Sequence, residues 1–149
     1  MWRLGGGRWF VLPILDTNAL TLSGSYTPIA GSTVTGTFVT GQGIGNLLSG
    51  GGAQAVDGEA NDSDSFTLQF MQAINEKLFL GVAYGQADYD ELTNTGSIDF
   101  DELQSVFVNA IYSPVDNLTF AAEYSQGRRE GSSGTDSADS IGSSVTYSF

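Results

Sequence analysis

Apolar and polar residues alternate with a period of two along most of this chain, and this pattern constrains the fold more than any other feature of the sequence. Successive side chains of a β-strand point to opposite faces, so strict alternation predicts strands with one apolar and one polar face. The seven segments that follow the pattern cover residues 20–26, 33–38, 66–74, 78–85, 106–112, 118–125 and 139–149. They predict an all-β fold.

The segments between the expected strands alternate in length. Short connections are expected at 27–31, 75–77 and 113–117, with Pro28 and Pro114 as turn residues. Long polar connections, rich in Gly, Ser and Asp, are expected at 41–62, 88–101 and 128–139. Short turns at one rim and long loops at the other are typical of barrels in the bacterial outer membrane. We therefore predict that residues 17–149 form a portion of an antiparallel, up-and-down transmembrane β-barrel with seven or eight strands.

The distribution of charge agrees with this hypothesis. A Lys or Arg on the lipid-facing side of such a strand costs about 2–4 kcal/mol at the middle of the bilayer. None of the apolar positions in the seven segments is charged, and Glu123, the one charge at bilayer depth, has the parity of the polar face. The continuous outward surface is expected to contain Phe66, Leu68, Phe70, Leu78, Leu80, Val82, Leu118, Phe120, Tyr124, Ile141, Val145, Tyr147 and Phe149.

Composition excludes several classes of function. The net charge is −12 with only five Lys and Arg, which argues against binding to nucleic acid because phosphates are bound by positive charge. The chain has no Cys and no His, and it therefore lacks the commonest general base and the commonest metal ligands. We expect no enzymatic activity, no cofactor and no metal site.

Residues 1–16 do not fit the strand pattern. Arg3 and Arg8 precede an apolar run at 9–15 that Pro13 interrupts, and no small-residue cleavage site follows. An export signal needs a basic start, an apolar stretch and a small-residue cleavage site. This stretch is expected to be an irregular N-terminal segment or the remnant of a preceding strand.

The last expected strand ends on an aromatic residue. Ile141, Val145, Tyr147 and Phe149 share one parity, and Phe149 is the final residue of the sequence. This arrangement resembles the C-terminal signal of bacterial outer-membrane barrels. The resemblance implies that the barrel-assembly machinery recognises these four residues.

A longer resemblance begins at position 117. The run N-L-T-F-A-A-E-Y-S-Q-G-R-R-E at 117–130, a Gly/Ser/Asp-rich stretch and S-V-T-Y-S-F resemble the end of the DcaP-like porins of Gram-negative bacteria. The run G-Q-G-I-G at 41–45 is also similar to theirs. The resemblance implies the C-terminal portion of an outer-membrane porin, homotrimeric when full length. Such a porin is surrounded by lipid and lipopolysaccharide and lets small solutes, often anionic ones such as dicarboxylates, diffuse passively.

Three charged residues are candidates for contact with solutes. Arg128 and Arg129 follow the sixth strand, where guanidinium groups at a pore mouth would attract anions, and only Arg129 has the parity of the polar face. Alternatively, both arginines are solvated and paired with Glu130 or with acids of the adjacent loop. Glu123 either lines the passage or makes a structural bond to Asn109 or Thr146.

The predicted inward residues favour a wide lumen. They are mainly Ser, Thr, Ala and Gly, whereas the interior of an eight-stranded barrel is just wide enough to be filled by side chains. Seven strands is also an odd number, so we expect a strongly curved sheet with one open edge near Leu20–Tyr26, or an imperfect closure there. The acidic residues in and beside the long connections either bind divalent ions that bridge lipopolysaccharide or form a solvated surface.

Two other classes of function remain open from the sequence. One is a small closed outer-membrane barrel with structural or adhesive acidic loops. The other is a soluble, secreted β-sandwich.

Overall fold

The computed structural model describes residues 3–4, 8–9, 18–44, 55–56, 59–94, 99–132 and 134–149. Every regular element within these residues is a β-strand, and no helix among them is long and apolar enough to cross a membrane. The main sheet contains β3 (Asn18–Tyr26), β4 (Ser32–Gln42), β7 (Asp62–Ala73), β8 (Leu78–Asn94), β9 (Asp99–Val115), β10 (Leu118–Gly131) and β11 (Gly134–Tyr147). Two short hairpins lie outside it, β1 (Arg3–Leu4) with β2 (Arg8–Trp9) and β5 (Ala55–Val56) with β6 (Glu59–Ala60).

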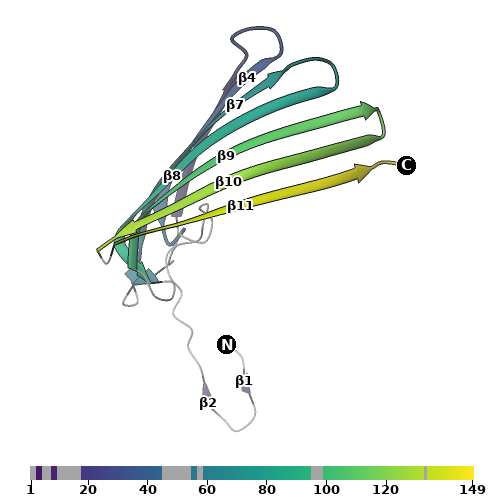
Figure 1. The fold of residues 1–149 in the computed structure, drawn as a ribbon. Coiled ribbons are helices and arrows are strands. Elements are labelled where there is room, and N and C mark those ends of the chain that lie inside the picture. The colour runs from purple at the N-terminus through teal and green to yellow at the C-terminus, as the bar shows by residue number, and fades with distance from the viewer. Residues whose placement is uncertain are drawn as a thin grey trace.

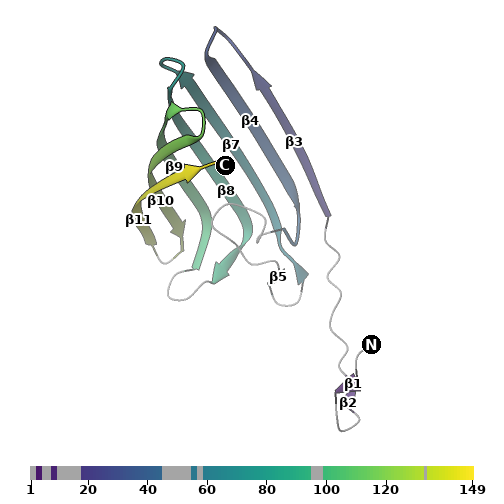
Figure 2. The ribbon, with the colours of Figure 1, turned by 90° about the vertical axis from the view of Figure 1, so that its right-hand side faces the viewer.

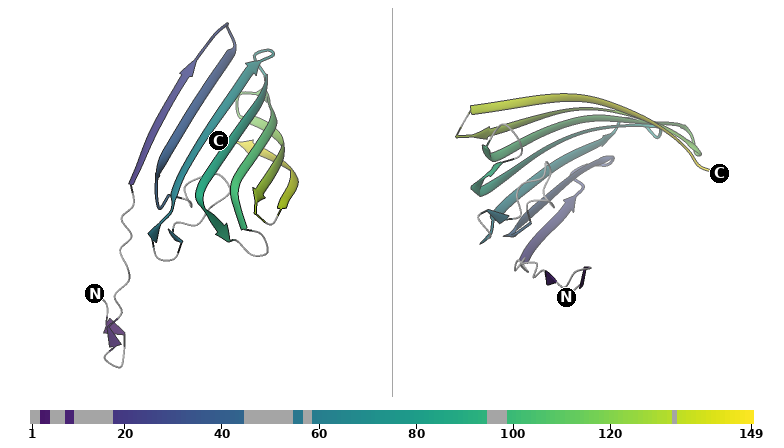
Figure 3. Two further views of the ribbon diagram at one scale, coloured as in Figure 1. Left: turned by 90° about the vertical axis from the view of Figure 1, so that its left-hand side faces the viewer. Right: turned by 90° about the horizontal axis from the view of Figure 1, so that it is seen from below.

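The main sheet is an antiparallel meander of seven strands in the order β11-β10-β9-β8-β7-β4-β3. It is a single curved layer (Figure 3), and β3 and β11 form its two edges (Figure 2). The predicted all-β, up-and-down architecture is therefore confirmed. The sheet is not closed as a barrel, because β3 and β11 do not pair with each other. The described residues also form no second sheet that could make a sandwich with the first.

The connections follow the predicted alternation at one end of the sheet only. The three short turns lie at the same end as the C-terminus (Figure 1). At the other end, residues 43–61 make a long connection, but those at 88–101 and 128–139 were wrongly predicted. Only residues 95–98 and 132–133 separate the strands there.

Backbone pairing explains the difference. Pairs such as Asp88 with Glu102 and Arg128 with Ser137 continue the ladder past the apolar positions. At this height the apolar side chains, such as Ala87 and Leu103, lie on the polar face, and carboxylates lie on the other side. The strands therefore continue where the apolar pattern that predicted them has ended.

The turn between β9 and β10 also differs from the prediction. Pro28 lies in the first turn as predicted, but Pro114 lies within β9, and the turn is formed by residues 116–117. The register changes from Leu118 opposite Val115 to Phe120 opposite Tyr112. Two residues of β9 therefore face one residue of β10, which is a β-bulge. A proline, which has no N–H to donate, is tolerated at such a site.

The register places the alternating apolar residues on one face. One row across all seven strands consists of Tyr26, Val34, Phe70, Val82, Val108, Tyr124 and Ile141. We call the side with this row the apolar face and the opposite side the polar face. The strand residues of the predicted outward set share the apolar face. Most of them are exposed, among them Leu68 at 53% and Ile141 at 85%, whereas Leu78 and Leu118 are half-buried.

Glycines on the two faces indicate the direction of curvature. A Cβ added at Gly24 or Gly36, which are register partners on the apolar face, would meet nothing within 4 Å. A Cβ added at Gly81, on the polar face, would overlap the side chains of Met71 and Asn109. At these positions the polar face is more crowded than the apolar face, as expected for a sheet curved toward its polar face.

Little of the described chain is buried. The buried hydrophobic side chains among the described residues are Ile44, Ala87, Tyr89, Phe100 and Leu103. They form one cluster on the polar face, near the end with the long connection, and Val39 packs against it. Most large apolar side chains lie instead on the open apolar face. Exposed apolar surfaces that continuous are typical of sites that contact a partner or a membrane.

Gly41 provides a test of the β3–β4 pairing. Its register partner is Ala19, and an added Cβ would overlap the backbone carbonyl of Asn18 and lie 2.8 Å from the Cα of Ala19. We expect Gly41→Val to destabilise the protein by about 1–3 kcal/mol, the usual cost of overpacking. The matched Gly36→Val variant fills open space and should have little effect. Equal shifts of the two variants in urea unfolding would contradict this register.

Candidate functional site

The middle of the polar face carries mainly small and hydroxyl side chains. Two neighbouring rows of the register contain Ser23, Thr37, Thr67, Gly85, Ser105, Gly127 and Ala138, and Ser25, Thr35, Gln69, Ala83, Phe107, Ser125 and Ser140. Some hydroxyls bond to each other across strands: Ser23 donates to Thr37 at 3.1 Å, and the Ser125 and Ser140 oxygens are 2.7 Å apart. Such a surface offers hydrogen bonds to water or to a polar solute.

Arg129 lies on the polar face of β10, beside the buried cluster. Its Cζ is 5.3 Å from the centroid of the Phe100 ring, a distance suited to a cation–π contact. Its register partner on β11 is Asp136, whose carboxylate accepts a 2.9 Å hydrogen bond from the backbone N–H of Ser137. Within the described part of the chain, no hydrogen bond or ion pair engages the Arg129 guanidinium.

The cluster beside Arg129 holds two aromatic rings in fixed positions. The rings of Tyr89 and Phe100 meet edge to face, with centroids 5.8 Å apart and an interplanar angle of 86°. The hydroxyls of Tyr89 and of its register partner Ser63 are buried without a hydrogen-bond partner. Burial raises the pKa of the Tyr89 phenol, while the nearby Arg129 charge lowers it and Asp88 raises it further. Along β8, Tyr89 lies closer to the end with the long connection than the rows of the apolar face do.

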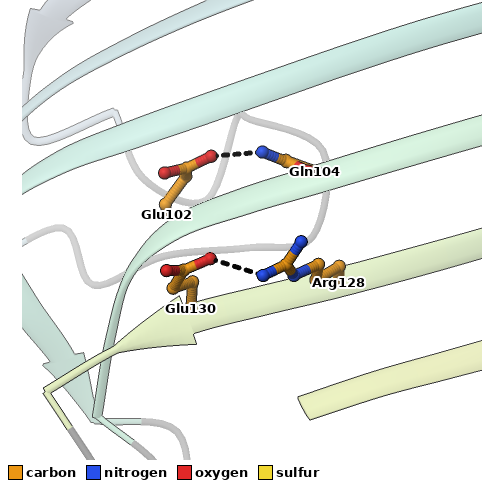
Figure 4. A network of polar contacts seen from close by, with 4 residues as sticks. All are labelled: Glu102, Gln104, Arg128 and Glu130. Atoms are coloured by element: carbon orange, nitrogen blue, oxygen red, sulfur yellow. Dashed lines mark hydrogen bonds and ion pairs between the residues drawn. The ribbon is translucent and has the colours of Figure 1, made fainter. Parts of the chain in front are cut away.

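Arg128 points to the opposite face from Arg129. It forms an ion pair with Glu130 at 2.9 Å (Figure 4), and each of the two side chains is 51% exposed. The alternative considered from the sequence, pairing with Glu130, is therefore observed for Arg128. Exposed pairs of this kind contribute about 0–1 kcal/mol to stability.

Four carboxylates form a row that the sequence did not reveal. Asp64, Asp88, Glu102 and Glu130 occupy neighbouring register positions on the same side as the apolar face, at the end with the long connection. Asp88 and Glu130 fall in segments predicted to be long connections, and Asp64 and Glu102 lie just beside such segments. Side-chain amides and one guanidinium donate hydrogen bonds to carboxylates of this row. For example, Gln104 donates to Glu102 (Figure 4). Among the described residues, no group of acidic side chains is arranged to hold a metal ion.

Glu123 lies on the polar face of β10, opposite Asn109 on one side and Gly142 on the other. Its side chain is exposed. Neither of the bonds considered from the sequence, to Asn109 or to Thr146, is present in the described structure. The Asn109 Oδ1 atom is itself buried without a partner.

The residues of the predicted assembly signal lie at one edge of the sheet. Ile141, Val145 and Tyr147 are on β11, at 85%, 65% and 55% exposure. The ladder ends with a 3.0 Å bond from the Ser148 N–H to the Asn117 carbonyl. Phe149 follows, with its ring 5.1 Å from that of Tyr147. Recognition of these residues by the assembly machinery stays a prediction.

No protein-family model matches this chain, and no curated protein matches it. The described polar face combines hydroxyls with one unpaired guanidinium at its rim and one exposed carboxylate further along β10. These groups can contact a polar or charged solute by charge and by hydrogen bonding.

Proposed function

We propose that this sheet is part of the wall of an outer-membrane porin, of the kind that the DcaP-like porins represent, through which small solutes, including anions, diffuse passively. The observation that carries the proposal is the separation of the two faces. Across seven strands, exposed aromatic and aliphatic side chains occupy one face, and small or hydroxyl side chains occupy most of the other.

A membrane would provide the apolar surroundings that the exposed apolar face needs. In water, the exposed aromatic and aliphatic side chains would be an aggregation hazard, whereas lipid tails solvate them. Antiparallel pairing satisfies the backbone N–H and C=O groups within the sheet, as a strand in hydrocarbon requires. The row of Asp64, Asp88, Glu102 and Glu130 then lies at the outer interface, beside the lipopolysaccharide headgroups.

The polar face would line the water-filled passage. Its small side chains leave room between facing walls, in contrast to a narrow barrel filled by larger residues. Arg129 would attract anions near the outer mouth, because a guanidinium in a confined passage raises the local concentration of negative solutes. Glu123 would line the same wall nearer the bilayer centre.

The remaining features of the proposal follow from the resemblance to DcaP-like porins. The barrel-assembly machinery would recognise the end of β11 and Phe149, and the full-length protein would assemble as a homotrimer. A small closed barrel with a structural or adhesive role is the alternative, and it differs from the porin in carrying no current.

Single cysteines test both the membrane and the passage, since the chain contains no Cys of its own. Thr67 and Leu68 are neighbours on β7 that face opposite sides. In planar bilayers that contain the complete protein, a charged, water-soluble thiol reagent should modify the Thr67→Cys variant and reduce its current. The Leu68→Cys variant should react only with a lipid-soluble reagent.

Two results would contradict the proposal in different ways. Equal reaction of both variants with the water-soluble reagent would show that the apolar face is not in lipid. Modification of Thr67→Cys in a membrane-embedded protein that carries no current would favour the structural or adhesive barrel.

A further inference from the structure

We propose that Phe100 is a positioning residue for Arg129: the buried ring holds the guanidinium on the polar face and keeps it from pairing with Asp136. The inference rests on the proposed function, because the consequence of this arrangement is anion selectivity of the passage. It adds to that function a residue that itself touches no solute.

The Arg129 guanidinium and the Phe100 ring form one unit. The ring is fully buried, at 0% exposure, and Arg129 Cζ lies 5.3 Å from its centroid. A cation over an aromatic face is attracted by the quadrupole of the ring. The ring therefore supplies a contact that uses none of the N–H donors of the guanidinium.

The ring is fixed by parts of the chain that are far apart in sequence. Tyr89 of β8 packs edge-on against it, and Ile44, just past β4, belongs to the same cluster. Gly43 has φ +68° and donates its N–H to the Asn61 carbonyl at 2.9 Å, which turns the chain so that Ile44 reaches this cluster. The position of Arg129 thus depends on β4, β8 and β9 as well as on its own strand.

Asp136 is the competing partner for the guanidinium. Directly opposite residues of an antiparallel pair have Cβ atoms about 4.5–5.5 Å apart, close enough for Arg129 and Asp136 to form an ion pair. In the structure, the carboxylate instead accepts the Ser137 N–H, and the guanidinium stays with Phe100. Without the ring, Arg129 would turn to Asp136, and its charge would be neutralised locally.

The test uses the complete, membrane-inserted protein and the reversal potential of single channels in a KCl gradient, which gives the ratio of chloride to potassium permeability. Arg129→Gln should lower this ratio. Phe100→Leu keeps an apolar side chain but removes the ring, and it should lower the ratio by about two- to fivefold, the range expected from loss of a cation–π contact. Phe100→Trp keeps an aromatic face and should retain the selectivity.

A double variant separates positioning from a general loss of structure. Phe100→Leu combined with Asp136→Asn removes the competing carboxylate and should restore much of the chloride selectivity. The reversal potential does not depend on the number of channels, so variants that assemble poorly can still be compared.

The possible results distinguish the inference from the proposed function. An unchanged ratio in Phe100→Leu, in a protein whose ratio falls with Arg129→Gln, would overturn the positioning role and leave the porin intact. A ratio that Arg129→Gln does not change would overturn the role of Arg129 and the inference together. Absence of any current from the inserted protein would overturn the porin itself and everything inferred from it.

Discussion

Replacing Val82 with arginine is expected to destabilise the protein by about 2–4 kcal/mol more than replacing its neighbour Ala83. Both residues lie in the part of β8 that carries the apolar rows, Val82 on the apolar face and Ala83 on the polar face. If the apolar face contacts lipid, the Val82→Arg variant places a charge where no water can solvate it. The same charge at Ala83 enters the water-filled passage.

The comparison is made by urea unfolding of the two variants in lipid vesicles. The adjacent positions share a strand and a depth, so the difference isolates the face. Most exposed substitutions in water change stability by less than about 0.5 kcal/mol. Similar unfolding midpoints for the two variants would therefore indicate that both faces are solvated by water, and the membrane interpretation would be wrong.

The strand segments that carry the apolar face could be predicted from the sequence. Along these segments, the residues of one face are mostly apolar and those of the other face are mostly polar. Leu68 and Val145 belong to different strands, yet each alternates with polar neighbours, and each lies on the predicted face. Parity also separated Arg128 from Arg129, which are adjacent in sequence and lie on opposite sides. When the two faces of a strand have different surroundings, apolar and polar residues alternate along its sequence.

What the sequence could not predict depends on register between strands. Phe100 falls in a stretch expected to be a loop, and Arg129 lies 29 positions later in the chain. Their contact requires β9 to begin at Asp99 and β10 to pair with it through Glu102 and Glu130. No local pattern encodes that pairing, because the rows of the apolar face end before this height. The row of four carboxylates was missed for the same reason.

The main sheet has two free edges, formed by β3 and β11. In an antiparallel meander of seven strands, the first and the last run in the same direction, so β3 and β11 are parallel to each other. Direct closure of β3 on β11 would need a parallel pair in an otherwise antiparallel barrel. Barrels formed by single bacterial chains have an even number of strands. An odd number of further strands, placed between β11 and β3, would make every pair antiparallel.

We therefore expect residues 1–149, refolded alone in detergent, to give no stable and uniform conductance steps in planar bilayers. An open edge in hydrocarbon leaves the N–H and C=O groups of β3 and β11 without partners, at several kcal/mol for each group. The same strands within a protein that supplies the missing pairs should conduct in uniform steps. Uniform conductance from residues 1–149 alone would show that β3 and β11 close on each other despite their parallel directions, and that the open edges of this sheet are not a site for further strands.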